Sequence, residues 1–368
     1  MAAYLSLLLI SAIVAYAVTP AVLALSRKIG AVDIPDDRKV HAVPTPTLGG
    51  TAIYLGVVVA TIAGAGLKPF AASFTPLFVW PLRELVAILL GTTIMFILGV
   101  VDDLKGLKAP AKLSGQVLAG GLVFLSGVRL EYFRFPAKGV GALSLDANLS
   151  AIATILWIVI IVNAVNLMDG LDGLAAGITA IAGGAFFIYT FELGRQGLTG
   201  PEPTAQLISI VIVGGTLGFL RYNFNPAKIF MGDSGSMTLG FLLATATVAG
   251  VGRSATANSG AAFLFYLPLA IPLIVLAIPI LDTILAVGRR LGKGQHVFHA
   301  DREHLHHRLL EIGHGHRQAV LIMYAWTGII AGTTLALTFA RGALIPFLGA
   351  AIGLVLYTLL PRLARPRP

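Results

Sequence analysis

Four polar side chains recur at intervals of three residues at the end of a strongly apolar run: Asn163, Asn166, Asp169 and Asp172. Because three residues fall about 60° short of a full turn of an α-helix, neighbours in this series share a face, and that face is rich in oxygen atoms. A charged side chain costs about 2.5–3.5 kcal/mol inside hydrocarbon, so these carboxylates are expected at a water-filled cleft. The series predicts a polar site at a membrane edge. A polar helix end followed by a tight turn is the alternative.

A pair of adjacent acids, Asp102 and Asp103, precedes Lys105 and Lys112. Adjacent carboxylates repel each other unless a cation or a proton lies between them. The pattern suits a polyphosphate bound through a metal, because the acids can hold Mg²⁺ while the lysines contact phosphate oxygens. Solvated charges at a helix end are the simpler alternative.

Two further acids occupy unusual surroundings. Asp233 stands between glycines and hydroxyl residues in Gly232–Ser236, where a bent backbone is free to donate N–H groups to an anion. Asp282 precedes Arg289 by seven residues, which places it about 10 Å inside an apolar helix. An ionisable residue at that depth is a functional candidate by default.

Histidines and arginines gather in the last long polar loop, which contains His304, His306, His307 and Arg308. Zinc is the competing interpretation, but the chain has no cysteine, and adjacent histidines cannot share one helical face. Contacts with nucleotide phosphate or sugar are favoured instead.

Near the N-terminus, the proline-rich segment Asp33–Gly50 predicts an irregular, water-exposed loop. His41 and the basic residues beside it can bind an anion. The alternative is that these basic residues only set the membrane topology.

The elements that must position these residues are membrane helices. The chain has 368 residues, of which 57% are hydrophobic and only 12% charged, whereas soluble proteins have about 25% charged residues. We predict an all-α polytopic membrane protein in one domain, 1–368. About eleven spans have sufficient length, namely 4–25, 48–67, 83–101, 113–127, 151–168, 173–193, 204–222, 237–254, 261–287, 318–340 and 343–361.

The distribution of basic residues predicts the orientation. Eighteen of the 26 lysines and arginines fall in one set of alternating loops, so these loops are expected in the cytoplasm, with the N-terminus outside and the C-terminus inside. The same set holds nearly every motif above, in loops at about 26–50, 102–112, 163–173, 221–236 and 288–317; Asp282 lies inside a predicted span. The net charge of +9 is spread over these short loops, which indicates anionic lipid or phosphorylated substrates and no nucleic acid. A small external hairpin is predicted within 128–150.

These motifs together resemble the polyprenyl-phosphate N-acetylhexosamine-1-phosphate transferases of glycosyltransferase family 4. The matching pieces run in order over most of the chain and comprise Asp102-Asp103 with its lysines, Asn163–Gly173, Phe230–Ser236, Pro279–Asp282 with Arg289-Arg290, and His304-Leu305-His306-His307. The last motif, with Arg38-Lys39-Val40-His41, is similar to the bacterial enzymes that start O-antigen, enterobacterial common antigen, teichoic acid or arabinogalactan linker synthesis. The related MurNAc-pentapeptide enzymes typically carry three consecutive histidines, which Leu305 interrupts here.

The resemblance implies transfer of GlcNAc-1-phosphate from UDP-GlcNAc to undecaprenyl phosphate, with release of UMP, at the cytoplasmic face of the bacterial inner membrane. This step starts the synthesis of lipid-linked cell-envelope glycans. The resemblance also implies Mg²⁺, or Mn²⁺ in its place, with Asp233 as the main ligand and Asn166 as the second. Catalytic roles would fall to Asp102, Asp103, Asp169 and Asp172. Substrate binding would involve Lys105, Lys112, Asn163, Asn223, Asp282, His304, His306, His307, Arg308 and His41.

Several alternatives stay open at this point. The donor could be another UDP-HexNAc, or the group transferred could be phospho-MurNAc-pentapeptide. A transporter would carry polar sites near the bilayer midplane and inverted repeats, and a CDP-alcohol phosphotransferase would carry an Asp-Gly and Ala-Arg pattern; neither is found. A catalytically silent scaffold on the same fold is a third rival. The sequence does not distinguish a monomer from a homodimer, or one downstream polymer from another. It also leaves the mechanism open between a direct displacement and a covalent intermediate, and it does not decide whether Asp102 acts as a base.

Overall fold

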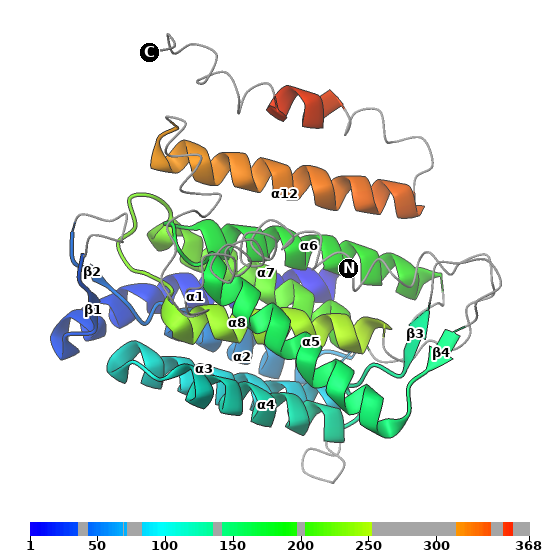
Figure 1. Cartoon of the computed structure of the whole chain (residues 1–368). Coiled ribbons are helices and arrows are strands. Elements are labelled where there is room, and N and C mark those ends of the chain that lie inside the picture. Colours follow the sequence, from blue (N-terminus) through cyan, green and yellow to red (C-terminus); the bar gives the residue numbers. More distant parts are fainter. Residues whose placement is uncertain are drawn as a thin grey trace, which may run out of the picture.

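Long helices form almost all of the computed structural model, which describes residues 1–35, 43–68, 70–71, 83–134, 142–196, 203–251, 314–339 and 349–355 (Figure 1). In chain order the elements are α1 (Ala2–Ile29), β1 (Val32–Asp33), β2 (Thr45–Pro46), α2 (Gly50–Ala65), α3 (Glu84–Lys105), α4 (Ala109–Leu125), β3 (Tyr132–Arg134), β4 (Ala142–Ser144), α5 (Ala147–Met168), α6 (Leu174–Arg195), α7 (Thr204–Asn223), α8 (Gly232–Val251) and α12 (His316–Phe339).

Six of these helices are long and apolar enough to cross a bilayer: α1, α3, α5, α6, α7 and α12. Helices α2 and α4 are apolar but shorter. The predicted polytopic helical membrane fold is therefore confirmed in its class. The count of eleven spans and the orientation stay predictions, because the predicted span 261–287 and most of 343–361 lie outside the described residues.

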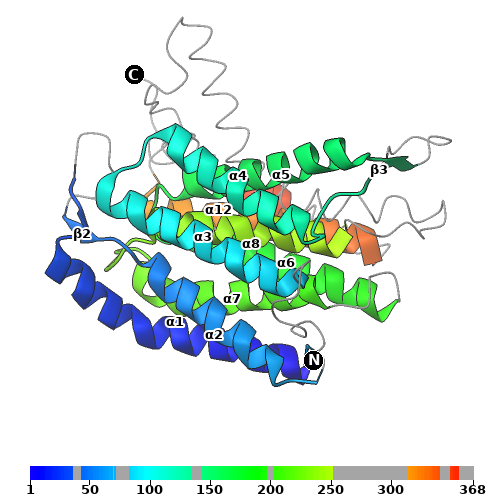
Figure 2. The ribbon, with the colours of Figure 1, turned by 90° about the horizontal axis from the view of Figure 1, so that it is seen from below.

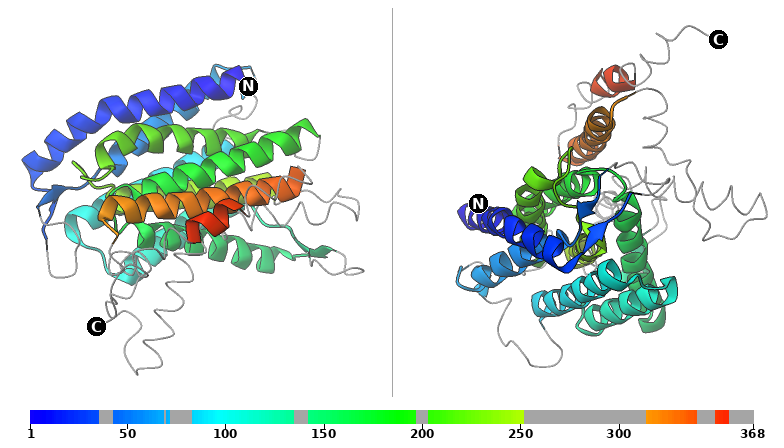
Figure 3. Two further views of the ribbon diagram at one scale, coloured as in Figure 1. Left: turned by 90° about the horizontal axis from the view of Figure 1, so that it is seen from above. Right: turned by 90° about the vertical axis from the view of Figure 1, so that its left-hand side faces the viewer.

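Helix α8 lies at the centre of the helix bundle. Its residues from Ser234 to Val248 are all buried, as expected for a helix that is apolar or small on every side. It packs against α3, α5 and α7, while α1 covers α2 and α7, and α12 lies against α6. The end-on view shows α8 in the middle, with α3 and α4 on one side and α12 on the opposite side (Figure 3). The view from below shows the helices side by side along most of their length (Figure 2).

Glycines let three backbones meet at the start of α8. A Cβ atom added to Gly50 of α2 would lie 2.1 Å from the backbone nitrogen of Gly235, and one added to Gly99 of α3 would lie 2.4 Å from the Cα atom of Ser234. Membrane helices associate through such small residues, because lipid provides no hydrophobic drive between them. Helices α2 and α3 are thereby held in direct contact with the first turns of α8.

The segment Asp33–Gly50 is only partly as predicted. Its second half is not water-exposed: residues 45–50 are buried, and β2 pairs with β1 in an antiparallel ladder. Phe230 N–H donates to the Pro46 carbonyl at 2.8 Å, and Gly49 N–H donates to the Phe230 carbonyl at 2.9 Å. The prediction was wrong for this half because the backbone partners lie some 180 residues further along the chain, where local sequence gives no sign of them.

The predicted hairpin within 128–150 is confirmed. Strands β3 and β4 pair antiparallel, with Phe133 opposite Leu143. Its base is tied to α5, because Ser150 Oγ donates to the Leu130 carbonyl at 2.7 Å and Leu130 N–H donates to Thr154 Oγ1 at 3.0 Å. The hairpin lies at the opposite end of the helices from β1 and β2 (Figure 1).

Candidate active site

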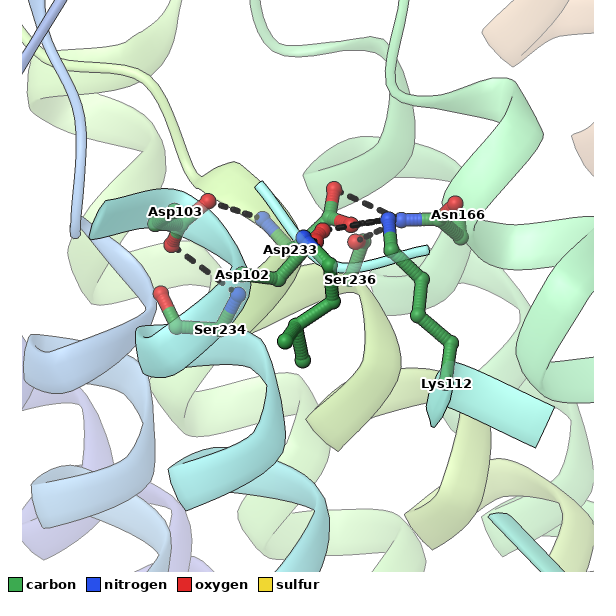
Figure 4. A network of polar contacts seen from close by, with 8 residues as sticks. Asp102, Asp103, Lys112, Asn166, Asp233, Ser234 and Ser236 are labelled. Carbon is green, nitrogen blue, oxygen red and sulfur yellow. Dashed lines mark hydrogen bonds and ion pairs between the residues drawn. The ribbon is translucent and has the colours of Figure 1, made fainter. Parts of the chain in front are cut away.

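The site is built around the first turn of α8. Asp103, near the end of α3, accepts hydrogen bonds from the backbone N–H groups of Asp233 at 2.7 Å and Ser234 at 3.1 Å (Figure 4). Helix N-termini leave such N–H groups without partners inside the helix, and a carboxylate there is stabilising. The sequence predicted that the backbone here would donate N–H groups to an anion. In the structure that anion is the side chain of Asp103.

Gly232 makes this arrangement sterically possible. Its φ angle is +71°, which favours glycine, and an added Cβ atom would lie 2.5 Å from Asp103 Oδ2 and 2.6 Å from Thr47 Oγ1. Any larger residue would therefore push against the carboxylate that caps α8. Glycine is thus required before Asp233 for two reasons: the backbone has a positive φ angle, and there is no space for a side chain.

The carboxylate of Asp233 is held by two neighbours. Lys112 Nζ, from the first turns of α4, donates to its Oδ2 at 2.6 Å, and Asn166 Nδ2, from α5, donates to its Oδ1 at 2.9 Å. Asn166 Nδ2 also donates to Ser236 Oγ at 2.9 Å. Side chains from two other helices, α4 and α5, therefore converge on Asp233, while 26% of its side-chain surface stays exposed.

Asp102 and Asp103 have different surroundings although they are adjacent. Asp102 Oδ1 accepts the Leu107 N–H at 2.5 Å, and its Oδ2 forms an ion pair with Lys112. The sequence predicted a cation or proton between the two neighbouring carboxylates. In the structure the cation is Lys112, and it lies between Asp102 and Asp233.

The turn between α5 and α6 is fixed from two sides. Asp172 Oδ2 accepts from Asn225 Nδ2 at 2.8 Å and from Ala227 N–H at 3.0 Å, while its own N–H donates to His316 Nε2 at 3.1 Å. The Tyr324 hydroxyl of α12 donates to the Gly173 carbonyl. The first turns of α12 and the loop after α7 thus hold this turn in place.

Asp169 lies in the same turn, close to the other acids. Burial first, and then the negative charges of Asp233, Asp103 and Asp172, together raise the pKa of Asp169 to about 8. A carboxyl group with such a pKa retains a proton at neutral pH until a cation compensates the surrounding negative charge. The site is therefore poor in positive charge for the number of acids it contains.

Other predicted residues lie further from this cluster. Asn163 donates to Gln116 Oε1 of α4 at 2.8 Å rather than facing α8, and Lys105 is exposed at the end of α3. Asn223, the last residue of α7, is buried and donates from Nδ2 to the Ile229 carbonyl at 3.0 Å. The remaining predicted residues lie outside the described residues: His41, Asp282, His304, His306, His307 and Arg308.

Sequence reasoning missed several partners. Ser236, Gln116, Asn225 and His316 bond directly to predicted site residues. Ser236 stands in the same motif as Asp233, and Asn225 in the same predicted loop, 221–236, so their proximity offered a signal. Gln116 offered none, because it sits within the predicted span 113–127 and its partner is set by how α4 packs on α5.

Comparison with known proteins supplies the family. The model of glycosyl transferase family 4 matches residues 85–251. The decaprenyl-phosphate N-acetylglucosaminephosphotransferase of Mycobacterium tuberculosis is 40% identical over 363 residues, which are 97% of this chain and 88% of the relative. The chain belongs to glycosyl transferase family 4. The probable undecaprenyl-phosphate N-acetylglucosaminyl 1-phosphate transferase of Bacillus subtilis is 36% identical over 86% of this chain and 80% of its own length.

Another group of relatives is similar over a shorter part of the chain. The phospho-N-acetylmuramoyl-pentapeptide-transferase of Enterococcus faecalis is 33% identical over 64% of this chain and 73% of its own length. The match of the family 4 model spans every described residue of the cluster, from Asp102 to Ser236. The resemblance stated from the motifs is therefore confirmed.

The donor set of this family 4 site fits a magnesium ion that is shared with a substrate. Asp102 and Asp233 both contact Lys112 Nζ, so their carboxylates face one common point. Among the described residues no three His, Cys, Asp or Glu side chains form a ready metal cage. Mg²⁺ is commonly held by one or two carboxylates together with waters and substrate phosphates, which matches this pair of acids. Asn166 presents its NH₂ group to Asp233, so its predicted role as a ligand requires the amide to turn.

Proposed function

We propose that this membrane protein transfers GlcNAc-1-phosphate from UDP-GlcNAc to a polyprenyl phosphate and releases UMP, thereby starting a lipid-linked glycan of the cell envelope. The observation that carries the proposal is the position of Asp233. It lies at the start of the central helix, with one carboxylate oxygen on Lys112 and the other on Asn166. The names of the two relatives that align over most of the chain support the same donor and class of acceptor.

In the proposed reaction, an oxygen of the lipid phosphate attacks the β-phosphorus of UDP-GlcNAc. The bond from that phosphorus to the bridging oxygen breaks, and UMP leaves with the electron pair. Mg²⁺, when bound, neutralises charge on the diphosphate. Asp233 and Asp102 would hold the ion, and Asn166 orients the Asp233 carboxylate. Proton removal from the acceptor is a minor requirement, because a phosphate monoester with a second pKa near 6 is mostly ionised at pH 7.

We further propose that the site faces the cytoplasm of a bacterial inner membrane. The loops that carry the site residues belong to the set with most of the lysines and arginines, and such loops are retained in the cytoplasm. UDP-sugars and Mg²⁺ would then reach Asp233 from the aqueous side, while the lipid acceptor arrives from the bilayer.

The function can be tested by UMP release. Purified protein is mixed with UDP-GlcNAc labelled in the uridine, with Mg²⁺, and with decaprenyl phosphate or undecaprenyl phosphate in parallel. Release should depend on the lipid and disappear with EDTA or in Asp233→Asn. Glu192→Gln removes a carboxylate from an exposed ion pair with Arg195 at the end of α6, and should behave like wild type.

Two outcomes would contradict parts of the proposal. Release from UDP-MurNAc-pentapeptide, but not from UDP-GlcNAc, would keep the reaction class and replace the donor. Equal release by wild type and Asp233→Asn would remove Asp233 from the reacting centre.

A further inference from the structure

The ammonium group of Lys112 occupies the point where two acidic side chains meet. Its Nζ atom contacts Asp102 Oδ2 and lies 2.6 Å from Asp233 Oδ2 (Figure 4). Asp102 comes from the end of α3, Lys112 from the start of α4, and Asp233 from the start of α8. A monovalent cation thus joins three helices at the position where the two carboxylates can share a charge.

A divalent ion cannot enter this point while the ammonium is there. Mg²⁺ binds carboxylate oxygens at about 2.0–2.1 Å, so an ion on the same two oxygens would lie within roughly 3 Å of Nζ. Two cations at that distance repel each other strongly in a site that is partly screened from water. The ammonium and the divalent ion are therefore alternatives for the same pair of carboxylates.

The partial exposure of Lys112 allows its ammonium group to move away from the two carboxylates. Its side chain is 26% exposed, whereas the Asp102 side chain that it contacts is 8% exposed. The lysine side chain is long and flexible, and its three N–H donors serve phosphate oxygens as well as carboxylates. If the ammonium moved away, it would place one free positive charge beside Asp233, where the proposed function requires the diphosphate of the nucleotide sugar to bind.

We propose that Lys112 is a tethered cation that holds Asp102 and Asp233 together before the metal arrives, and that binding of a divalent ion displaces it. The displaced ammonium is then available to the phosphates of the substrate. This inference rests on the proposed metal dependence. It also explains why a lysine that was predicted to bind phosphate is paired with two carboxylates here. Lys112 binds the carboxylates before the metal ion arrives and the substrate phosphates afterwards.

The direct test is the chemical reactivity of the Lys112 amine. Purified protein in detergent is treated with an amine-acetylating reagent with and without Mg²⁺, and the modification of each lysine is followed by mass spectrometry. The rate at Lys112 should rise severalfold when Mg²⁺ is present. Lys108 directly precedes the same helix, is exposed and forms no ion pair among the described residues, so its rate should stay constant.

A second test measures the competition itself, through the binding of Mn²⁺ followed by electron paramagnetic resonance. Lys112→Met removes the competing ammonium and keeps the length of the side chain, so it should bind Mn²⁺ more tightly than wild type. Lys108→Met removes the same charge four residues earlier and serves as the matched control, which should bind like wild type.

The outcomes separate this inference from the proposed function. Mn²⁺ binding to wild type with no change in Lys112 reactivity overturns the exchange and leaves the metal site standing. Weaker Mn²⁺ binding by Lys112→Met also overturns it, because the lysine would then support the ion. If wild type binds no divalent ion, the metal part of the proposed function fails together with the exchange.

Discussion

Asp103 accepts the backbone N–H groups of Asp233 and Ser234, so removing its carboxylate should loosen the start of α8. In Asp103→Ala both N–H groups lose their acceptor. Loss of a helix cap costs about 0.5–2 kcal/mol, and loss of a negative charge at a helix N-terminus costs about 0.3–1 kcal/mol. We therefore expect the free energy of unfolding to fall by about 1–3 kcal/mol. At about 2 °C for each kcal/mol in a large chain, Tm should fall by about 2–6 °C.

Thermal unfolding in detergent, followed by far-UV circular dichroism, measures this change. Asp103→Asn keeps one acceptor oxygen but turns an NH₂ group toward the other N–H, so its Tm should lie between those of Asp103→Ala and wild type. Asp102→Ala is the matched neighbour, because it removes an adjacent carboxylate and leaves both N–H groups of α8 bonded. A lower Tm for Asp102→Ala than for Asp103→Ala would refute the reasoning.

Three further predictions concern the surroundings of the same site. Gly232→Ala should lower both Tm and UMP release, because its Cβ atom would lie 2.5 Å from Asp103 Oδ2 and φ is +71°. Tyr324→Phe should cost about 1 kcal/mol of unfolding free energy, since the Gly173 carbonyl loses a donor; an unchanged denaturant midpoint would contradict this. The pKa of Asp169, raised to about 8, lies above its unfolded value, so this group favours folding below about pH 4 and loses that effect as pH rises to 8. Without divalent ions, Tm should therefore fall between pH 5 and 8, and Asp169→Asn should reduce that fall.

Much of the helical architecture was predictable because it follows from local composition. Apolar runs of sufficient length correspond to α3, α5 and α7, and turn residues between short alternating runs predicted the pairing of β3 with β4. The segment 45–50 was not predictable, because its burial depends on backbone partners at Phe230 and Met231. Backbone pairing between segments that are distant in the sequence leaves no periodic pattern of hydrophobic residues in either segment.

The candidate site was predictable in its members and only partly in their arrangement. Two of the predicted residues, Asn166 and Lys112, bond to the Asp233 side chain, while their roles toward metal and phosphate stay predictions. The motifs could not separate Asp102 from Asp103, because adjacent residues on a helix point about 100° apart and each meets whichever element packs there. That packing depends on Gly99, whose missing side chain lets α3 reach the first turn of α8.

The glycine contacts of α2, α3 and α8 also determine how the protein responds to its membrane. A bilayer that is thinner or thicker than the helices makes them tilt. Helices in backbone contact pivot about the place where they touch, and here that place is Gly50, Gly99 and Gly235, beside Asp233. We therefore expect tilting to displace the far helix ends, near the hairpin of β3 and β4, more than the residues around Asp233. A mismatch between helix length and bilayer thickness would then disturb the candidate site little.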